Sequence, residues 1–209
     1  MRLTKFSHSC VRFEDGSRSL VIDPGVHSES AAALDGAQAV LITHEHADHL
    51  DPAALLSAVK ANPGLRVWAP AGVAVDGVEV TEVQAGQTFE AAGFAVETFG
   101  GQHAVVHPSI SVIGNVSYLV AGRVYHPGDS FAVPTKPVQT LLVPIHAPWS
   151  KIAEVIDFMV SVRAPQAFQI HDGLLNEAGL QVSEAHLTRI GGSYGSEFRH
   201  LSAGSSLDV

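Results

Sequence analysis

Four side chains that can bind metal ions lie within six consecutive residues, and this cluster constrains the fold more than any other feature of the chain. The six residues are 44–49, and they follow directly on the apolar run Ala39–Thr43. Residues two apart on an extended backbone point the same way, so His44 and His46 can bind one ion. The turn that follows lets Asp48 and His49 face a second ion. A single histidine of this kind is well explained as a solvent-exposed residue. Four ligand-type side chains this close together instead predict a metal site at the end of a strand.

The pattern of apolar and turn-forming residues predicts an α/β fold. Short apolar runs bounded by turn residues predict strands. These are expected at Leu3–Phe6, Cys10–Phe13, Ser19–Ile22, Ala39–Thr43, Arg66–Ala69, Phe94–Phe99, Val116–Val120, Val124–Tyr125, Leu141–Val143 and Ala167–Ile170. Asp51 as N-cap and Pro52 at the first helical position predict a helix that ends at Asn62. Two further helices are expected at Lys151–Val162 and Glu177–Thr188.

The order of elements repeats along the chain. The strand and turn that end at Pro24-Gly25 have a counterpart that ends at Pro127-Gly128, about 103 residues later. In both halves a hairpin, a turn, a strand and a helix follow in the same order. We expect two similar halves, packed sheet to sheet with helices outside, within a single domain that spans residues 1–209.

Composition and charge exclude several classes of protein. The chain has 12 Lys and Arg against 21 Asp and Glu, a formal charge of −9, and no basic run, which disfavours nucleic acid as a partner. No apolar run approaches the ~20 residues that span a bilayer, and polar Ser7 and His8 interrupt the start of the chain before a signal-peptide core could form. With the single cysteine, Cys10, this predicts a cytoplasmic protein without a membrane anchor.

Residues 44–49, the strand before them with Thr43, and the early Ile22-Asp23-Pro24 resemble the metallo-β-lactamase-fold hydrolases, over nearly the whole chain. The pair His8-Ser9 near the amino terminus is similar to the lactonase-like branch of small cytoplasmic metal-dependent hydrolases. The resemblance implies an α/β fold that forms a four-layer αββα sandwich with two similar halves. It also implies a site for two metal ions.

The resemblance assigns further metal ligands to three positions. His103 follows the strand Phe94–Phe99 as the next histidine ligand, with His107 close enough to compete for that role. Asp129, in a Gly-Asp pair, is the carboxylate expected to bridge the ions, and His171 is the last ligand. The first ion would be bound by His44, His46 and His103, the second by Asp48, His49 and His171, and Asp129 would be shared.

Other polar residues are expected around the ions. His8, His107 and His146 are candidates for the substrate pocket. Asp23 is expected to orient a ligand imidazole. A structural role is expected for His126, and ordinary surface positions are expected for His27, His186 and His200.

The leading functional hypothesis is a binuclear metal-dependent hydrolase of a small-molecule lactone, ester or phosphodiester. Zinc is the expected divalent metal because histidine dominates the ligand set, with manganese or iron as alternatives. The ions would activate a hydroxide bridged between them, and Asp48 or Asp129 would accept the proton. Cys10 is a weaker candidate for a protein nucleophile. The alternative function is iron-dependent redox chemistry with oxygen or sulfur on the same fold.

Overall fold

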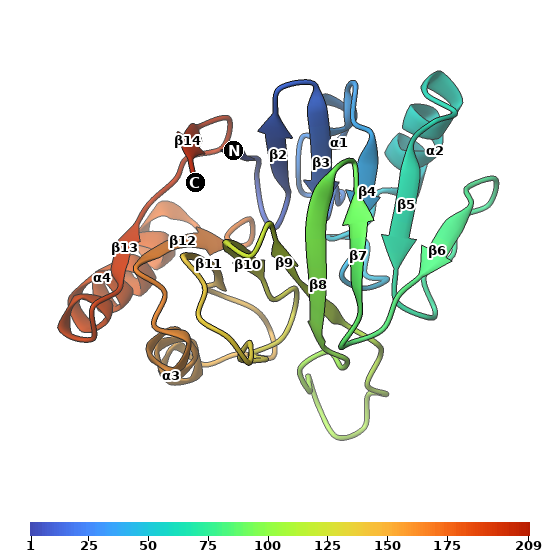
Figure 1. Ribbon diagram of the computed structural model, residues 1–209. Helices are drawn as coiled ribbons and strands as arrows, with labels where there is room; N and C mark the ends of the chain where they lie inside the picture. Colours follow the sequence, from blue (N-terminus) through green and yellow to red (C-terminus); the bar gives the residue numbers. More distant parts are fainter.

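Two seven-stranded mixed sheets form the centre of the molecule, and the computed structural model describes all residues 1–209 (Figure 1). The first sheet has the order β14 (Ser206–Asp208), β1 (Arg2–Lys5), β2 (Val11–Asp15), β3 (Arg18–Ile22), β4 (Ala39–Leu41), β5 (Arg66–Ala69) and β6 (Val80–Glu82). The second has the order β13 (Glu197–Arg199), β12 (Gln166–Ile170), β11 (Thr140–Pro144), β10 (Val124–His126), β9 (Val116–Val120), β8 (Phe94–Gly100) and β7 (Thr88–Ala91). The helices are α1 (Ser30–Leu34), α2 (Pro52–Ala61), α3 (Ile152–Val162) and α4 (Glu177–Ser193).

The side-chain alternation of the strands divides the interior into three apolar cores. On β3, Leu20 and Ile22 belong to the core between the sheets, whereas Val21 between them packs in the core under α1 and α2. The third core, with Leu141 and Phe158, lies between the second sheet and α3 and α4. Side chains alternate between the two faces of a strand, so a central strand of a layered α/β fold is buried on both faces. The expected four-layer αββα sandwich is therefore confirmed.

The expected similarity of the two halves is confirmed by the pairing of the strands. In the first sheet β2 and β3 are antiparallel, and β3, β4, β5 and β6 then follow in parallel. In the second sheet β9 and β10 are antiparallel, and β10, β11, β12 and β13 follow in parallel. The last strand of the chain, β14, crosses back to pair with β1, so the first sheet contains one strand from the second half, whereas the second sheet consists of the consecutive strands β7 to β13.

Most expected elements are present, with differences at their ends. The strand expected at Ala39–Thr43 ends at Leu41, because the backbone of Thr43 bonds instead to the side chain of Asp23 and to Val116 of the other sheet. The helix expected to end at Thr188 continues to Ser193. The strands β6, β7, β13 and β14 and the short helix α1 were not predicted.

Helix α2 begins as predicted. The side chain of Asp51 accepts hydrogen bonds from the backbone N–H groups of Ala53 and Ala54, and Pro52 occupies the first turn. This cap fixes the direction in which the chain leaves the 44–49 segment. Among the four helices, none combines the length and the apolar character that crossing a lipid bilayer requires.

Gly25 allows the loop after β3 to lie directly against the 44–49 segment. A Cβ atom at this position would overlap the backbone carbonyl group of Asp48. The amide of the next residue, Val26, donates to the carbonyl of Ala47 at 2.8 Å. The close approach of two backbones thus holds the metal-binding segment in place, and only glycine permits it.

We predict that Gly25→Ala lowers the free energy of unfolding of the metal-free protein by about 1–3 kcal/mol, because the added methyl group must push the 44–49 segment aside. Denaturant unfolding measures this change. The matched control is Gly192→Ala in α4, where the new methyl group meets open space and helix propensity favours alanine. Equal stability of the two variants would show that the close approach does not matter.

Candidate metal centre

Two clusters of metal-binding side chains lie at the ends of the strands, across both halves of the molecule. One contains His44, His46, His103 and Asp129, and the other contains His8, Asp48, His49 and His171. Within each cluster the potential ligand atoms all lie within 4.8 Å of one another. In each cluster, loops that follow strands of the two different sheets supply ligands. The centre therefore depends on the two sheets being packed together.

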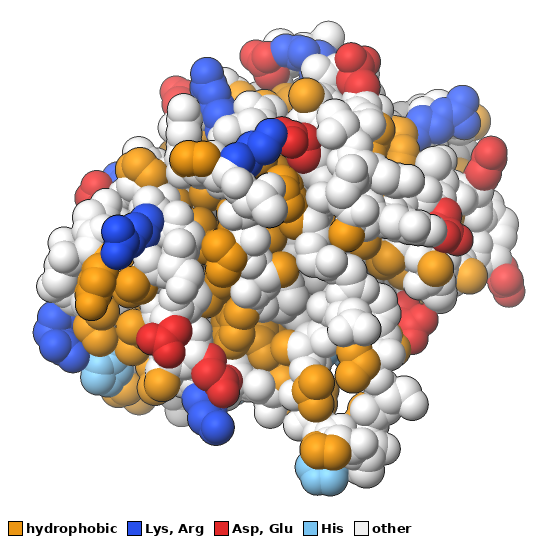
Figure 2. Space-filling model, turned by 60° about the horizontal axis from the view of Figure 1, so that its bottom comes forward, with side chains coloured by type: hydrophobic (Ala, Val, Ile, Leu, Met, Phe, Trp, Pro, Cys, Tyr) orange, Lys and Arg blue, Asp and Glu red, His pale blue; other side chains and the backbone are white.

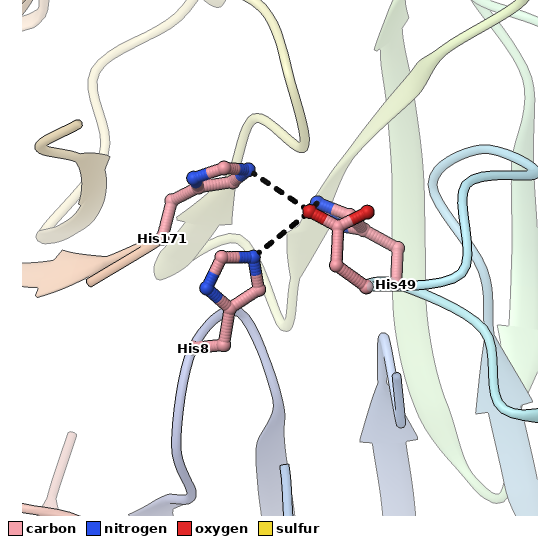
Figure 3. A group of neighbouring side chains, drawn as sticks. His8, His49 and His171 are labelled. Carbon is pink, nitrogen blue, oxygen red and sulfur yellow. Dashed lines mark hydrogen bonds and ion pairs between the residues drawn. The ribbon is translucent and has the colours of Figure 1, made fainter. Parts of the chain in front are cut away.

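The second cluster shows how the side chains converge. Figure 3 shows His8, His49 and His171 directed toward a common region from three separate elements. The Nε2 atoms of His8 and His171 lie 3.1 Å and 3.5 Å from Oδ2 of Asp48. The rings of His8 and His171 are also in contact, with centroids 4.1 Å apart. Several nitrogen and oxygen lone pairs thus point at one small volume.

The unpaired polar atoms of the clusters fit bound metal ions. Buried atoms without a hydrogen-bond partner include Nε2 of His49, His103 and His171 and Oδ1 of Asp129. His49 Nε2 lies 3.0 Å from Asp129 Oδ1, but the two atoms do not meet the geometry of a hydrogen bond. Leaving four such atoms buried and unpaired is costly. Coordination of cations by these atoms removes that cost, so the residues fit the two-ion site.

The other ring nitrogen of each buried histidine is held by the protein. Nδ1 of His103 donates to the carbonyl of Ala104 at 2.6 Å, and Nδ1 of His171 donates to the carbonyl of His146 at 2.6 Å. Such bonds fix the tautomer and leave Nε2 as the free ligand atom. The substrate-pocket candidate His146 thus acts on the site through its backbone, and its own side chain is only half-buried.

Asp23 is fully buried and holds two parts of the site at once. Its carboxylate accepts bonds from the backbone N–H and the hydroxyl of Thr43, both at 2.7 Å, and from Nδ1 of His49 at 2.6 Å. The Thr43 hydroxyl in turn lies 3.0 Å from Nδ1 of His44. The structure places Asp23 where it orients the imidazole of His49, which is the role expected for it.

Asp129 lies between the two clusters. Its Oδ2 atom is 3.3 Å from Nε2 of His103 in one cluster and 3.1 Å from Nε2 of His171 in the other. The backbone N–H of Asp129 donates to the side chain of Asn115 at 2.9 Å. Nε1 of Trp149 donates to Oδ2 at 2.9 Å. The carboxylate is therefore held in an intermediate position, as a bridging role requires.

Sequence reasoning missed Asn115 and Trp149, and it placed two histidines differently. His8 was expected in the substrate pocket, but it is fully buried within the second cluster. His107 lies outside both clusters on an exposed loop, where Nδ1 contacts only Ser109 of the same loop. His27 is exposed, as expected, and its ring also packs against His8, with centroids 5.5 Å apart.

Three further histidines lie outside the two metal-binding clusters. His126 is buried, donates to the carbonyl of Ser9 at 2.9 Å and accepts from the N–H of Gly128, which is a structural role. His200 is exposed and pairs with Glu184 at 2.6 Å. His186 is partly exposed on α4.

Three residues of the site adopt backbone angles that favour glycine. The φ angles of His8, Asp23 and His171 are 59°, 52° and 59°, which accounts for three of the six non-glycine residues with positive φ. Each such residue costs on the order of 1 kcal/mol or more and persists only where its surroundings enforce it. Backbone strain is therefore concentrated where these side chains must be aimed at the centre.

Charges within the centre shift its titration in the metal-free protein. Burial lowers the pKa of His49, but the charges of Asp129 and Asp23 outweigh burial and raise that pKa well above its ordinary value. Burial likewise opposes protonation of His171, but the adjacent carboxylates of Asp129 and Asp48, 3.1 Å and 3.5 Å from its Nε2 atom, raise its pKa to about 9. Burial lowers the pKa of His44 well below its ordinary value. The carboxylates of Asp23, Asp48 and Asp129 thus favour the protonated forms of His49 and His171 in the metal-free protein.

Comparison with known sequences identifies the family. The model of the Beta-lactamase superfamily domain matches residues 2–171. Protein Rv0786c of Mycobacterium tuberculosis is 39% identical over 181 residues, which cover 84% of this chain and 85% of that protein. The UPF0173 metal-dependent hydrolase Atu1317 of Agrobacterium fabrum is 32% identical over 154 residues, covering 62% and 63% of the two chains.

Solved structures share the fold over the full length of the chain. Igni18, a metallo hydrolase from Ignicoccus hospitalis, matches with a TM-score of 0.74 at 18% identity, covering 99% of this chain and 97% of Igni18. CmlA, a diiron β-hydroxylase from Streptomyces venezuelae, matches with a TM-score of 0.72 at 16% identity, covering 100% of this chain and 54% of CmlA. With the family model, the fold and the two His/Asp clusters in agreement, the chain belongs to the metallo-β-lactamase superfamily, as a metal-dependent hydrolase.

Proposed function

We propose that the protein hydrolyses a small-molecule lactone, ester or phosphodiester, with zinc as its resident metal, in the manner of the lactonase-like branch. The observation that carries this proposal is the position of Asp129 between two adjacent His/Asp clusters. Two ions bound there would supply Lewis acidity and lower the pKa of a coordinated water toward ~7. Six of the eight cluster residues are histidines, and imidazole suits zinc well.

Protein groups around the clusters can handle the proton of the attacking water. The carboxylate of Asp48 is about one quarter exposed, whereas that of Asp129 is buried. Burial opposes ionisation of Asp48, but the adjacent imidazole of His171 and the hydrogen bond with His8 hold the pKa of this carboxyl well below its usual range. Asp48 is therefore the more accessible of the two cluster carboxylates, as a group that meets the attacking water must be. We assign it the role of proton acceptor, with His8 at 3.1 Å to share the proton.

No side chain of the protein is needed as a nucleophile. Cys10 is fully buried, and burial raises the pKa of its thiol far above neutral pH, so it remains protonated and unreactive. This argues against the weaker hypothesis of covalent catalysis. A cytoplasmic location and the absence of a nucleic-acid partner stay predictions, which the single cysteine and the net charge of −9 support.

Iron-dependent redox chemistry is the second candidate function. CmlA, described as a diiron β-hydroxylase, shares this fold over 54% of its chain, and this likeness supports the candidate. Imidazole and carboxylate ligands also accept iron. Metal identity and reaction type therefore separate the two candidates.

We predict that protein purified without added metal contains zinc, with about two ions per chain after reconstitution. Elemental analysis measures the content, and a panel of lactones, esters and phosphodiesters measures hydrolysis. Iron as the bound metal, together with oxygen consumption and no hydrolysis, would favour the redox function instead.

We predict that Asp129→Ala loses one ion and at least about 100-fold in hydrolysis, because the carboxylate between the clusters is removed. The matched control is His107→Ala, which should keep both ions because His107 lies outside the clusters. Elemental analysis of both reconstituted variants checks this. If His107→Ala empties a site, the ligand assignment is wrong.

We predict that zinc binding near pH 7 releases about two protons, from His49 and His171, whose raised pKa values keep them protonated in the metal-free protein. Because protons compete with the metal, zinc affinity should rise with pH until both imidazolium groups have lost their protons, His171 with a pKa of about 9. Calorimetric titrations in buffers of different ionisation enthalpy count the protons. Zinc binding without proton release would contradict the protonated metal-free state.

A further inference from the structure

The loop between β8 and β9 exposes an unusual amount of apolar surface. All residues from Val105 to Val112 are exposed. Four of the ten exposed large hydrophobic side chains of the protein lie here, namely Val105, Val106, Ile110 and Val112. Figure 2 shows this segment as the projecting lobe at the lower right, with hydrophobic side chains and a histidine at its surface. The segment 104–114 contains no charged residue apart from the titratable His107.

The base of this apolar loop, residues 104–113, is fixed to the metal centre. His103, the residue before the loop, belongs to the first cluster, and its N–H donates to the carbonyl of Ile113 at 3.0 Å. The N–H of Ala104 donates to the carbonyl of Asp129 at 2.8 Å. Asn115, which follows the loop, accepts from the N–H of Asp129. Both ends of the loop are therefore bonded to residues that would hold the ions.

The loop leaves the protein on the open side of the centre. Most of the cluster is buried, but His46 is exposed and Asp48 is half-buried. The ring of His46 lies 4.8 Å from that of His103, where the loop begins. Val105 is two residues beyond His103, within about 7 Å along an extended chain. The aliphatic side chains thus begin beside the accessible part of the metal centre.

We propose that the metal centre acts on substrates with an apolar chain, and that the apolar loop covers this chain while the polar group to be hydrolysed faces the metal centre. The inference rests on the proposed hydrolytic function and adds the substrate class to it. Contiguous exposed aliphatic side chains next to a binding site indicate a surface that is covered in use. A charged or sugar-like substrate would gain nothing from Val105, Val106, Ile110 and Val112, whereas an alkyl chain gains from each methylene it buries.

Straight-chain carboxylates test the inference without using catalysis. Butanoate, hexanoate and octanoate share the carboxylate that hydrolysis of an ester or lactone would produce, and they differ only in chain length. Binding to the zinc-loaded protein is measured by calorimetry. Each covered methylene should improve binding about threefold, so octanoate should bind roughly 30- to 100-fold more tightly than butanoate.

Two matched variants assign the effect to the loop. Val105→Ser/Ile110→Ser removes two exposed aliphatic side chains from the loop, and Ile152→Ser/Val182→Ser removes the same two types from α3 and α4. The first variant should reduce the difference between octanoate and butanoate to less than about fivefold, and the second should preserve it. Both variants change exposed positions outside the metal clusters, so zinc content should remain that of the parent protein.

Several results would overturn the inference. Equal affinities for all chain lengths would do so while leaving hydrolysis intact, and absence of both carboxylate binding and hydrolysis would remove the proposed function as well. A chain-length effect that survives Val105→Ser/Ile110→Ser would place the apolar contact elsewhere. Two further results would overturn the inference if the parent protein shows no chain-length effect. If the parent protein sediments as a dimer and Val105→Ser/Ile110→Ser sediments as a monomer, the loop contacts a second copy. If the parent protein binds phosphatidylcholine vesicles and the variant does not, the loop contacts a lipid surface.

Discussion

The buried carboxylate of Asp23 joins the structural and chemical parts of this protein. It accepts hydrogen bonds from the backbone and hydroxyl of Thr43 and from the imidazole of His49. The carbonyl of Thr43 then accepts the N–H of Val116 on β9 of the opposite sheet. One side chain therefore aligns the end of β3, the metal-binding segment and the contact between sheets. Without it, these donors would be buried and unpaired, which costs about 1–3 kcal/mol for each group.

The two halves have similar topology but divide the chemistry between them. The first half supplies five of the cluster residues, from the turn before β2 and the segment after β4. The second half supplies His103, Asp129 and His171, each on a different loop. Because every ion would bind side chains from both halves, metal occupancy opposes separation of the sheets. A ligand at about 1,000 times its dissociation constant stabilises the folded state by about 4 kcal/mol.

Local sequence patterns predicted much of this arrangement, and the predictions that failed did so for physical reasons. Central strands could be predicted because burial on both faces demands continuous apolar residues. The edge strands β6 and β14 contain no fully buried residue, so their sequences lack that pattern. Helix α4 was expected to end at Thr188, but it continues through Gly191, where the missing side chain allows Met159 of α3 to pack closely against the helix. His8 gives no local signal of its place in the second cluster, because its ring is aimed there by a left-handed backbone angle and by Asp48, 40 residues away.

The contact between Trp149 and Asp129 has a consequence for observing the centre. The chain has two tryptophans, and the other, Trp68, is stacked on Phe89 at 5.6 Å between ring centroids. The Trp149 indole donates to a carboxylate between the clusters, and its ring lies 6.0 Å from that of His103 and 6.3 Å from that of His171. A cation that draws charge from Asp129 therefore alters the electric field at this indole. The tryptophan fluorescence of the protein therefore reports whether metal is bound at the centre, without any added dye.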